Sequence, residues 1–337
     1  MAVTPAIFGL AGPQLSREER AFFADARPAG YILFKRNCVD RAQLRALTDS
    51  LRALEGRADV AILIDQEGGR VARMQPPEWP AFPAGGAFEA LYRRAPASAI
   101  AAAEANAEAL GLMLAEVGVT VDCAPILDGR HAGADEVIGD RAYGDDPLAV
   151  AAIGRAVLDG LARAGIVGII KHMPGHGRVR VDSHKELPIV DAPAAALDED
   201  LLPFRRLAAR AAIGMTAHIV YPAWDPTAPA TLSPTVIERV IRSQIGFAGL
   251  LMTDDIDMKA LSGTPAEKAC AALAAGCDLV LDCWARMDEM TAIAAAAPPI
   301  TAAAQARLDA AMASVRPGDP ARFADLVATR DRLLALA

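Results

Sequence analysis

The middle of the chain reads Ile166-Val-Gly-Ile-Ile-Lys-His172, a short apolar run that ends in two ionisable residues. An unbroken apolar run of this length is typical of a parallel strand that is buried on both faces. Similar runs, most of them followed by a segment of helical length, occur at Ala6–Leu10, Tyr31–Phe34, Val60–Ile64, Val119–Ala124, Ala212–Met215, Leu250–Met252 and Leu279–Leu281. Eight strands that alternate with helices predict an α/β fold, a single-domain (β/α)8 TIM-type barrel. An open doubly wound sheet is the alternative, but no Gly-x-Gly-x-x-Gly motif follows the first run.

Helical signals lie between the apolar runs. Ser16-Arg-Glu-Glu19 has the pattern of a capping box, and we expect Asp40-Arg-Ala-Gln43 to form a second one. Longer helices are predicted over Ala97–Val117 and Pro147–Ala164, with a shorter helix over Pro234–Gln244 and a closing helix from Pro320.

Composition limits the classes of partner. The 337-residue chain is 53% hydrophobic and carries a formal net charge of −8, which is typical of a globular domain and disfavours nucleic-acid binding. No stretch is apolar enough for a transmembrane helix, and the N-terminus lacks the basic region of a signal peptide. The five cysteines have no Cys-x-x-Cys spacing, which indicates reduced thiols. We therefore expect a soluble, cytoplasmic monomer that binds neither nucleic acid nor membrane.

Polar residues gather where the predicted strands end, and the C-terminal ends of barrel strands form the catalytic face of this fold. The residues concerned are Asp65, Glu67, Arg70 and Arg73 after the third run, Asp122 and Asp128 at the fourth, Lys171, His172, His176, Asp182 and His184 after the fifth, His218 after the sixth, Asp254 and Asp255 after the seventh, and Asp282 at the eighth. Three histidines, a lysine and an aspartate within Lys171–His184 are difficult to explain by packing alone.

Some of these residues have structural interpretations. Asp65, Asp254 and Asp255 are candidates for helix N-caps, and His218 is as consistent with the barrel wall as with ligand binding. Arg141 is a candidate for a local ion pair with Asp140 or Asp145.

Three classes of function fit the polar set. Glycoside hydrolysis needs a carboxylate nucleophile, which Asp254 offers, and a proton donor, which His184 offers with Asp182 beside it. A metal-dependent barrel hydrolase would use His172, His176, His184, His218 and Asp254 as ligands, although the sequence has no His-x-His after the first run and no His-Glu-x-x-His. A non-catalytic sugar-binding barrel would need the pocket but no matched acid and nucleophile.

Five motifs in order along the chain carry a family resemblance. They are Ile62-Leu-Ile-Asp-Gln-Glu-Gly-Gly-Arg-Val-Ala-Arg73, Val137-Ile-Gly-Asp-Arg-Ala-Tyr-Gly144, Lys171-His-Met-Pro-Gly-His-Gly177 with Asp182-Ser-His184, Met215-Thr-Ala-His218, and Met252-Thr-Asp-Asp-Ile-Asp-Met258. Together they resemble bacterial β-N-acetylglucosaminidases of glycoside hydrolase family 3, the NagZ type of peptidoglycan recycling. Larger members of that family carry a second α/β domain, whereas here we expect a single catalytic barrel domain over residues 1–337.

The resemblance implies a role for each matching residue. Asp254 corresponds to the nucleophile and His184 to the general acid/base, which is paired with Asp182 on the same loop. The residues that correspond to the binding site for the terminal N-acetylglucosamine are Asp65, Arg73, Arg141, Lys171 and His172. Arg178 and Arg180 make the loop more basic than in relatives, which we expect to alter loop packing or the affinity for an anionic leaving group.

The implied activity is that of a retaining exo-β-N-acetylglucosaminidase. It removes terminal N-acetylglucosamine from (1,6-anhydro)muropeptides in cell-wall recycling, through a covalent glycosyl-enzyme and with neither cofactor nor metal. Two alternatives use the same site. A histidine acid/base does not repel an incoming anion, so an N-acetylglucosaminide phosphorylase is one, and a chitooligosaccharide hydrolase is the other.

Overall fold

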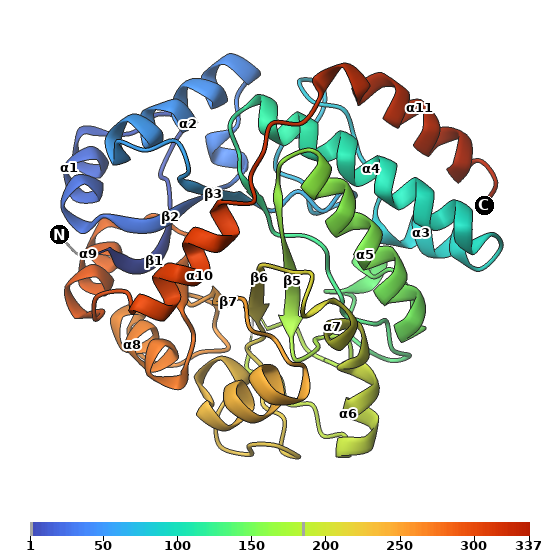
Figure 1. Cartoon of the computed structure of the whole chain (residues 1–337). Coiled ribbons are helices and arrows are strands. Elements are labelled where there is room, and N and C mark those ends of the chain that lie inside the picture. Colours follow the sequence, from blue (N-terminus) through green and yellow to red (C-terminus); the bar gives the residue numbers. More distant parts are fainter. Residues whose placement is uncertain (1–2, 184–185) are drawn as a thin grey trace.

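The eight apolar runs form eight parallel strands of a closed barrel in the computed structural model, which describes residues 3–183 and 186–337 (Figure 1). Each strand pairs with the next along the chain, and β8 pairs with β1 to close the ring. The strands are β1 (Thr4–Gly9), β2 (Pro28–Leu33), β3 (Ala61–Ile64), β4 (Val121–Asp122), β5 (Val167–Met173), β6 (Ile213–Thr216), β7 (Leu250–Asp255) and β8 (Leu279–Asp282). The predicted (β/α)8 barrel is confirmed.

The strand ends differ from the sequence prediction at the positions that matter most. β5 continues beyond the apolar run, so Lys171 and His172 belong to the strand and not to the loop after it. Pairing of Met173 with Thr216 of β6 and a bridge from Lys171 to Ile126 supply partners for this extension. β7 likewise extends to Asp255. Strand membership holds these side chains on the rigid wall of the barrel.

Helices surround the barrel. They are α1 (Arg17–Ala26), α2 (Arg41–Glu55), α3 (Gly85–Tyr92), α4 (Pro96–Glu116), α5 (Pro147–Arg163), α6 (Ala194–Asp200), α7 (Leu202–Leu207), α8 (Pro265–Ala275), α9 (Met287–Ala296), α10 (Ala302–Met312) and α11 (Phe323–Leu334). Short 3₁₀ turns occur at η1 (Lys35–Asn37), η2 (Gly139–Arg141), η3 (Ala230–Leu232) and η5 (Pro320–Arg322), and the helix predicted from Pro234 is a π-helix, η4 (Val236–Gln244).

Helix caps follow the sequence signals with one difference. Ser16 and Glu19 form the predicted capping box of α1. Asp40 caps α2 by accepting a hydrogen bond from the backbone N–H of Gln43, but the Gln43 side chain accepts from the backbone N–H of Val39 and not from that of Asp40. The prediction of a second capping box is therefore wrong in one of its two hydrogen bonds. The Gln43 side chain reaches the N–H of Val39 instead of the N–H of the cap residue Asp40.

The two ends of the barrel differ. Inward-facing side chains such as Leu63, Ile169 and Ile213 form an apolar cluster with Leu308 and Met312 of α10, which lies across one end of the barrel (Figure 1). The predicted closing helix corresponds to α11, which lies along α4. No helix within the described ranges is long and apolar enough to cross a membrane. With α10 packed beneath the apolar interior, the open mouth is at the C-terminal ends of the strands.

Candidate active site

A cavity of about 300 Å³ opens at this mouth and brings most of the predicted residues together. Among the residues that line it are Asp65, Arg73, Arg141, Lys171, His172 and Asp254. Asp182 is half-buried and does not line the cavity, although its neighbour Ser183 does. His184 lies outside the described residues. Six of the eight predicted site residues therefore share one cavity.

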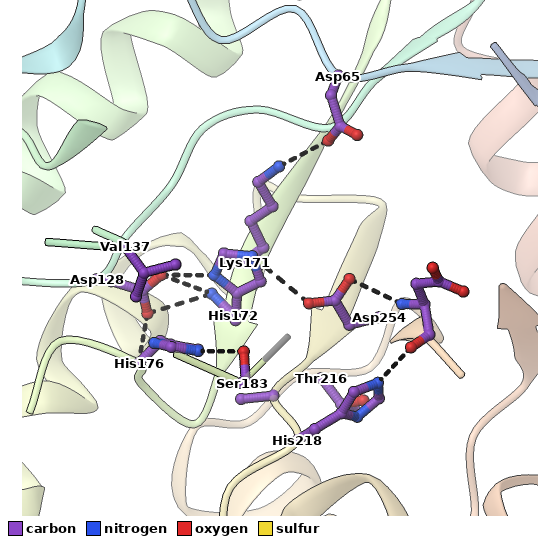
Figure 2. Close-up of polar contacts among 12 residues, drawn as sticks. Asp65, Asp128, Val137, Lys171, His172, His176, Ser183, Thr216, His218 and Asp254 are labelled. Carbon is purple, nitrogen blue, oxygen red and sulfur yellow. Dashed lines mark hydrogen bonds and ion pairs between the residues drawn. The ribbon is translucent and has the colours of Figure 1, made fainter. Parts of the chain in front are cut away.

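Asp65 and Lys171 form the centre of an ion-pair network on one side of the cavity (Figure 2). The Nζ atom of Lys171 lies 3.0 Å from Oδ1 of Asp65, and Nη2 of Arg73 lies 3.1 Å from Oδ2. Burial raises the pKa of Asp65, but the charges of Lys171 and Arg73 outweigh burial and lower it overall. Asp65 is therefore an ionised acceptor held between two cations, an arrangement suited to binding sugar hydroxyls.

Glu67 is a central member of this network that the sequence analysis did not assign. Its carboxylate accepts bonds of 2.9 and 2.8 Å from Nε and Nη2 of Arg141, and the Lys171 ammonium lies 2.7 Å away. Burial opposes ionisation of Glu67, but Arg141 and Lys171 lower its pKa overall. The signal for Glu67 was its place in the turn after β3, where Gly68 and Gly69 have φ values of 99° and 56°. That turn directs Glu67 towards the two cations.

The local ion pair considered for Arg141 is wrong. Asp140 pairs with Arg70, and Asp145 pairs with Arg93. Arg141 lies at the end of the η2 turn, where its side chain is directed into the cavity and meets Glu67.

Asp128 positions two histidines of the Lys171–His184 segment (Figure 2). Its carboxylate lies 2.7 Å from Nδ1 of His172 and accepts a 2.6 Å bond from the backbone N–H of His176. Burial raises the pKa of Asp128, but interaction with His172 lowers it overall. Because an ionised carboxylate can only accept, Nδ1 of His172 carries a proton and Nε2 faces the cavity.

Asp254 lies at the end of β7, and its side chain is 22% exposed. Its Oδ1 accepts a 2.8 Å bond from the backbone N–H of Asp255, and its Oδ2 lies 3.9 Å from Nε2 of His172. Burial raises the pKa of Asp254, but interactions with His172 and His218 lower it to about 2. For Asp255, burial raises the pKa to about 6. Of these adjacent carboxyls, Asp254 stays ionised well below neutral pH, whereas Asp255 takes up a proton as the pH falls through about 6.

His218 and His176 have structural partners. His218 bonds to Thr231 at 2.7 Å and to the backbone oxygen of Asp255 at 2.9 Å, which agrees with its interpretation as a wall residue. His176 lies 3.2 Å from Ser183, and burial lowers its pKa to about 4, so it is neutral at physiological pH. Arg178 bonds to Asp200 of α6 at 2.6 Å, so this basic residue contributes to loop packing.

Two buried carboxyls near the cavity are only partly satisfied. Oδ1 of Asp122 accepts from the backbone N–H of Gln66, whereas its Oδ2 has no partner in the described part of the chain. Both oxygens of Asp282 at the end of β8 lack a partner among the same residues, and burial raises its pKa to about 7. Within 3–183 and 186–337, no group of three or more His, Cys, Asp or Glu side chains is placed to hold a metal ion.

Comparisons with known proteins, by sequence and by structure, all indicate the same family. The model of the glycosyl hydrolase family 3 N-terminal domain matches residues 4–316. A β-hexosaminidase of Alkalilimnicola ehrlichii is 43% identical over 84% of this chain and 81% of its own length, and one of Aromatoleum aromaticum is 35% identical over 94% and 89%. The crystal structure of NagZ from Neisseria gonorrhoeae in complex with N-trifluoroacetyl-D-glucosamine superposes with a TM-score of 0.88 at 31% identity, covering 100% of this chain and 99% of that one.

Proposed function

The chain belongs to glycoside hydrolase family 3 and is a glycoside hydrolase of the β-hexosaminidase type, and from this premise we propose a specific reaction for it. It is a retaining exo-β-N-acetylglucosaminidase that removes terminal N-acetylglucosamine from (1,6-anhydro)muropeptides. The proposed setting is cell-wall recycling in the cytoplasm, where the five free thiols stay reduced. The similarity to a structure that holds N-trifluoroacetyl-D-glucosamine supports an N-acylated glucosamine as the sugar.

The environment of Asp254 carries the proposal. A retaining glycosidase needs one ionised carboxylate as nucleophile and a separate proton donor. Asp254 has a pKa of about 2, opens into the cavity, and lies on the same mouth as the Asp65–Lys171 network. A carboxylate that is ionised without prior deprotonation can attack the anomeric carbon at neutral pH.

The mechanism has two steps. In the first, an oxygen of Asp254 forms a bond to C1 while the bond from C1 to the leaving oxygen breaks, and protonated His184 gives its proton to that oxygen. In the second, neutral His184 takes a proton from water, the water oxygen bonds to C1, and the Asp254 carboxylate leaves. In this proposal the negative charge of Asp182 stabilises the protonated form of His184.

In this proposal the sugar is bound by charged side chains that ion pairs hold in position before the substrate binds. Asp65 accepts from sugar hydroxyls, Lys171 and Arg73 donate to them, and His172 offers Nε2 beside the anomeric carbon. Glu67 holds Arg141 through two hydrogen bonds, which leaves the guanidinium in place before the substrate arrives. A preformed site of this kind avoids the entropy of ordering long side chains on binding.

Turnover of 4-nitrophenyl N-acetyl-β-glucosaminide, compared with the glucoside, tests the proposal. We expect release from the first substrate only, with free N-acetylglucosamine as product in the presence of phosphate and no loss of rate with a chelator. A sugar 1-phosphate product would identify a phosphorylase, and loss of rate with the chelator would identify a metal-dependent hydrolase. Binding of the sugar without turnover would identify a binding protein.

A further inference from the structure

Ser183 attaches the loop that follows β5 to the wall of the cavity. This loop begins after Met173 and carries the proposed general acid, His184, which is the next residue after Ser183 in the chain. The Ser183 side chain is buried, lines the cavity, and has its Oγ atom 3.2 Å from Nε2 of His176 (Figure 2). Since consecutive Cα atoms are about 3.8 Å apart, the position of Ser183 limits where the next residue can lie.

His176 is a fixed point on that wall. Its backbone N–H donates to Oδ1 of the buried Asp128 at 2.6 Å, and the same carboxylate holds His172 of β5. The two imidazole rings pack with their centroids 5.5 Å apart. The carbonyl oxygen of Gly175, one position earlier, accepts a 2.6 Å hydrogen bond from the buried Tyr221 hydroxyl. Groups on or after β4, β5 and β6 therefore hold the backbone and the ring of His176 in place.

The protonation state of the His176 ring suits a positioning role. Burial and the charge of His172 lower its pKa to about 4, so the ring is uncharged at neutral pH and does not serve as the proton donor itself. A neutral imidazole still forms a hydrogen bond with a hydroxyl, and within 3–183 and 186–337 the other ring nitrogen, Nδ1, has no hydrogen-bond partner. An uncharged ring also adds no positive charge that would lower the pKa of a protonated His184 nearby.

The middle of the loop is attached elsewhere. Arg178 donates to Oδ2 of Asp200 at 2.6 Å and to the carbonyl oxygen of Ala196 at 3.0 Å, both of which belong to α6. These three residues do not line the cavity, whereas Ser183 and His176 both do. Loss of the bond between Ser183 and His176 should therefore leave the loop attached to α6 while the end that carries the acid loses its defined position.

We propose that His176 is a positioning residue for the general acid, and that it acts through its hydrogen bond to Ser183. The bond holds the end of the loop against the cavity wall, so that His184 lies where the leaving oxygen can take its proton. Proton transfer needs hydrogen-bond distance, and a displacement of about 1 Å is enough to weaken it strongly. This inference rests on the proposed function, because it takes His184 as the acid, and it goes beyond that function by naming two residues that set the position of the acid.

Ser183→Ala tests the bond with two substrates, methyl β-N-acetylglucosaminide and the 4-nitrophenyl glycoside. Methoxide needs a proton to leave and nitrophenolate does not, so only the methyl glycoside depends on the position of the acid. We expect kcat/KM to fall by about tenfold for the methyl glycoside and by less than about twofold for the 4-nitrophenyl glycoside. Ser233→Ala is the matched control, because Ser233 is also buried and its hydroxyl bonds to Asp225 outside the cavity, and it should leave the ratio unchanged.

His176→Gln and His176→Phe test the other partner. Glutamine keeps a hydrogen-bonding group near the position of Nε2 and should retain most of the wild-type ratio. Phenylalanine fills the space without forming the bond and should change the ratio as Ser183→Ala does. If both residues act through one bond, the double variant of His176→Phe and Ser183→Ala loses no more than the worse single variant. Should His176→Phe fail to fold, Ser183→Ala still decides the proposal.

The outcomes separate the positioning role from the proposed function. If the wild type hydrolyses neither substrate, the proposed function fails and the positioning role fails with it. If His184→Ala loses activity equally on both substrates, there is no acid to position and this inference is wrong. If His184→Ala is selective, but Ser183→Ala and His176→Phe lower kcat/KM equally for both substrates or for neither, the positioning role is wrong while the proposed function stands.

Discussion

The Nε2 atom of His172 lies 3.9 Å from Oδ2 of Asp254, a separation too long for a hydrogen bond and short enough for one ligand oxygen to contact both (Figure 2). The other ring nitrogen of His172 bonds to Asp128 at 2.7 Å, which holds the plane of the ring. The acetamido group of N-acetylglucosamine, on the carbon next to the anomeric carbon, would lie beside these two groups. The sugar-binding residues and the proposed nucleophile are thereby joined into one site.

Asp254→Asn tests the nucleophile. An amide is a much weaker nucleophile than a carboxylate, so we expect kcat to fall by about three orders of magnitude or more. Asp255→Asn is the neighbouring control and should have a much smaller effect. Proton NMR of the wild-type reaction should show the β-anomer first, and an initial α-anomer would contradict a covalent intermediate.

His184→Ala tests the acid/base. A nitrophenolate leaves without a proton, whereas a sugar alkoxide needs one in the transition state, and general acid catalysis contributes roughly 10²–10⁴-fold. We expect the glycosylation rate to fall by about that factor for a disaccharide, and far less for the 4-nitrophenyl glycoside. Equal losses for the two substrates, measured by single-turnover kinetics, would indicate a structural role for this histidine.

Glu67→Gln tests the positioning of Arg141 and Lys171. A neutral amide cannot balance two buried cations, so both lose orientation, and KM should rise by about tenfold or more with a smaller change in kcat. Glu89→Gln is the matched control, because Glu89 is also buried and pairs with Arg93 and Arg130 outside the cavity. Both variants should lower the melting temperature, but only Glu67→Gln should raise KM. An equal KM for the two variants would contradict the positioning role.

Asp282→Asn tests the buried carboxyl that has no hydrogen-bond partner among the described residues. Its pKa in the folded protein is about 7, above the ordinary value of 3.8, so folding favours the protonated form. Its contribution to the free energy of unfolding is complete below about pH 4, falls as the pH rises to about 7, and is then constant. The loss is on the order of a few kcal/mol. The asparagine variant cannot ionise and should melt at a higher temperature than the wild type at pH 8.

A carboxyl with partners should behave in the opposite way. Asp278 is also buried, and it pairs with Arg242 at 2.9 Å and Arg307 at 2.7 Å. Asp278→Asn leaves two guanidinium groups without their carboxylate and should lower the melting temperature at pH 8. Calorimetry of both variants between pH 5 and pH 8 gives the comparison. The same pH slope in Asp282→Asn as in the wild type would show that Asp282 is not the titrating group.

The order of apolar runs along the chain was enough to predict the barrel. Strands buried on both faces need continuous apolar residues, and this requirement is local, so it is visible in runs such as Ile166–Ile170. The convergence of Asp65, Lys171 and Asp254 followed from the same prediction, because parallel strands in a closed ring all end at one mouth. The five family motifs then gave these residues their expected roles.

Partners across the mouth were decided only by the tertiary structure. Local sequence suggested Asp140 or Asp145 for Arg141, but the η2 turn directs its side chain into the cavity, to Glu67, which is 74 positions away in the chain. Asp128 holds His172 across 44 positions, and Arg36 reaches the carbonyl of Cys283 across 247. Sequence spacing carries no information about such contacts, because they depend on how the loops fold back over the mouth after the barrel has closed. Hydrogen bonding and charge then select among the groups that this closure brings within reach.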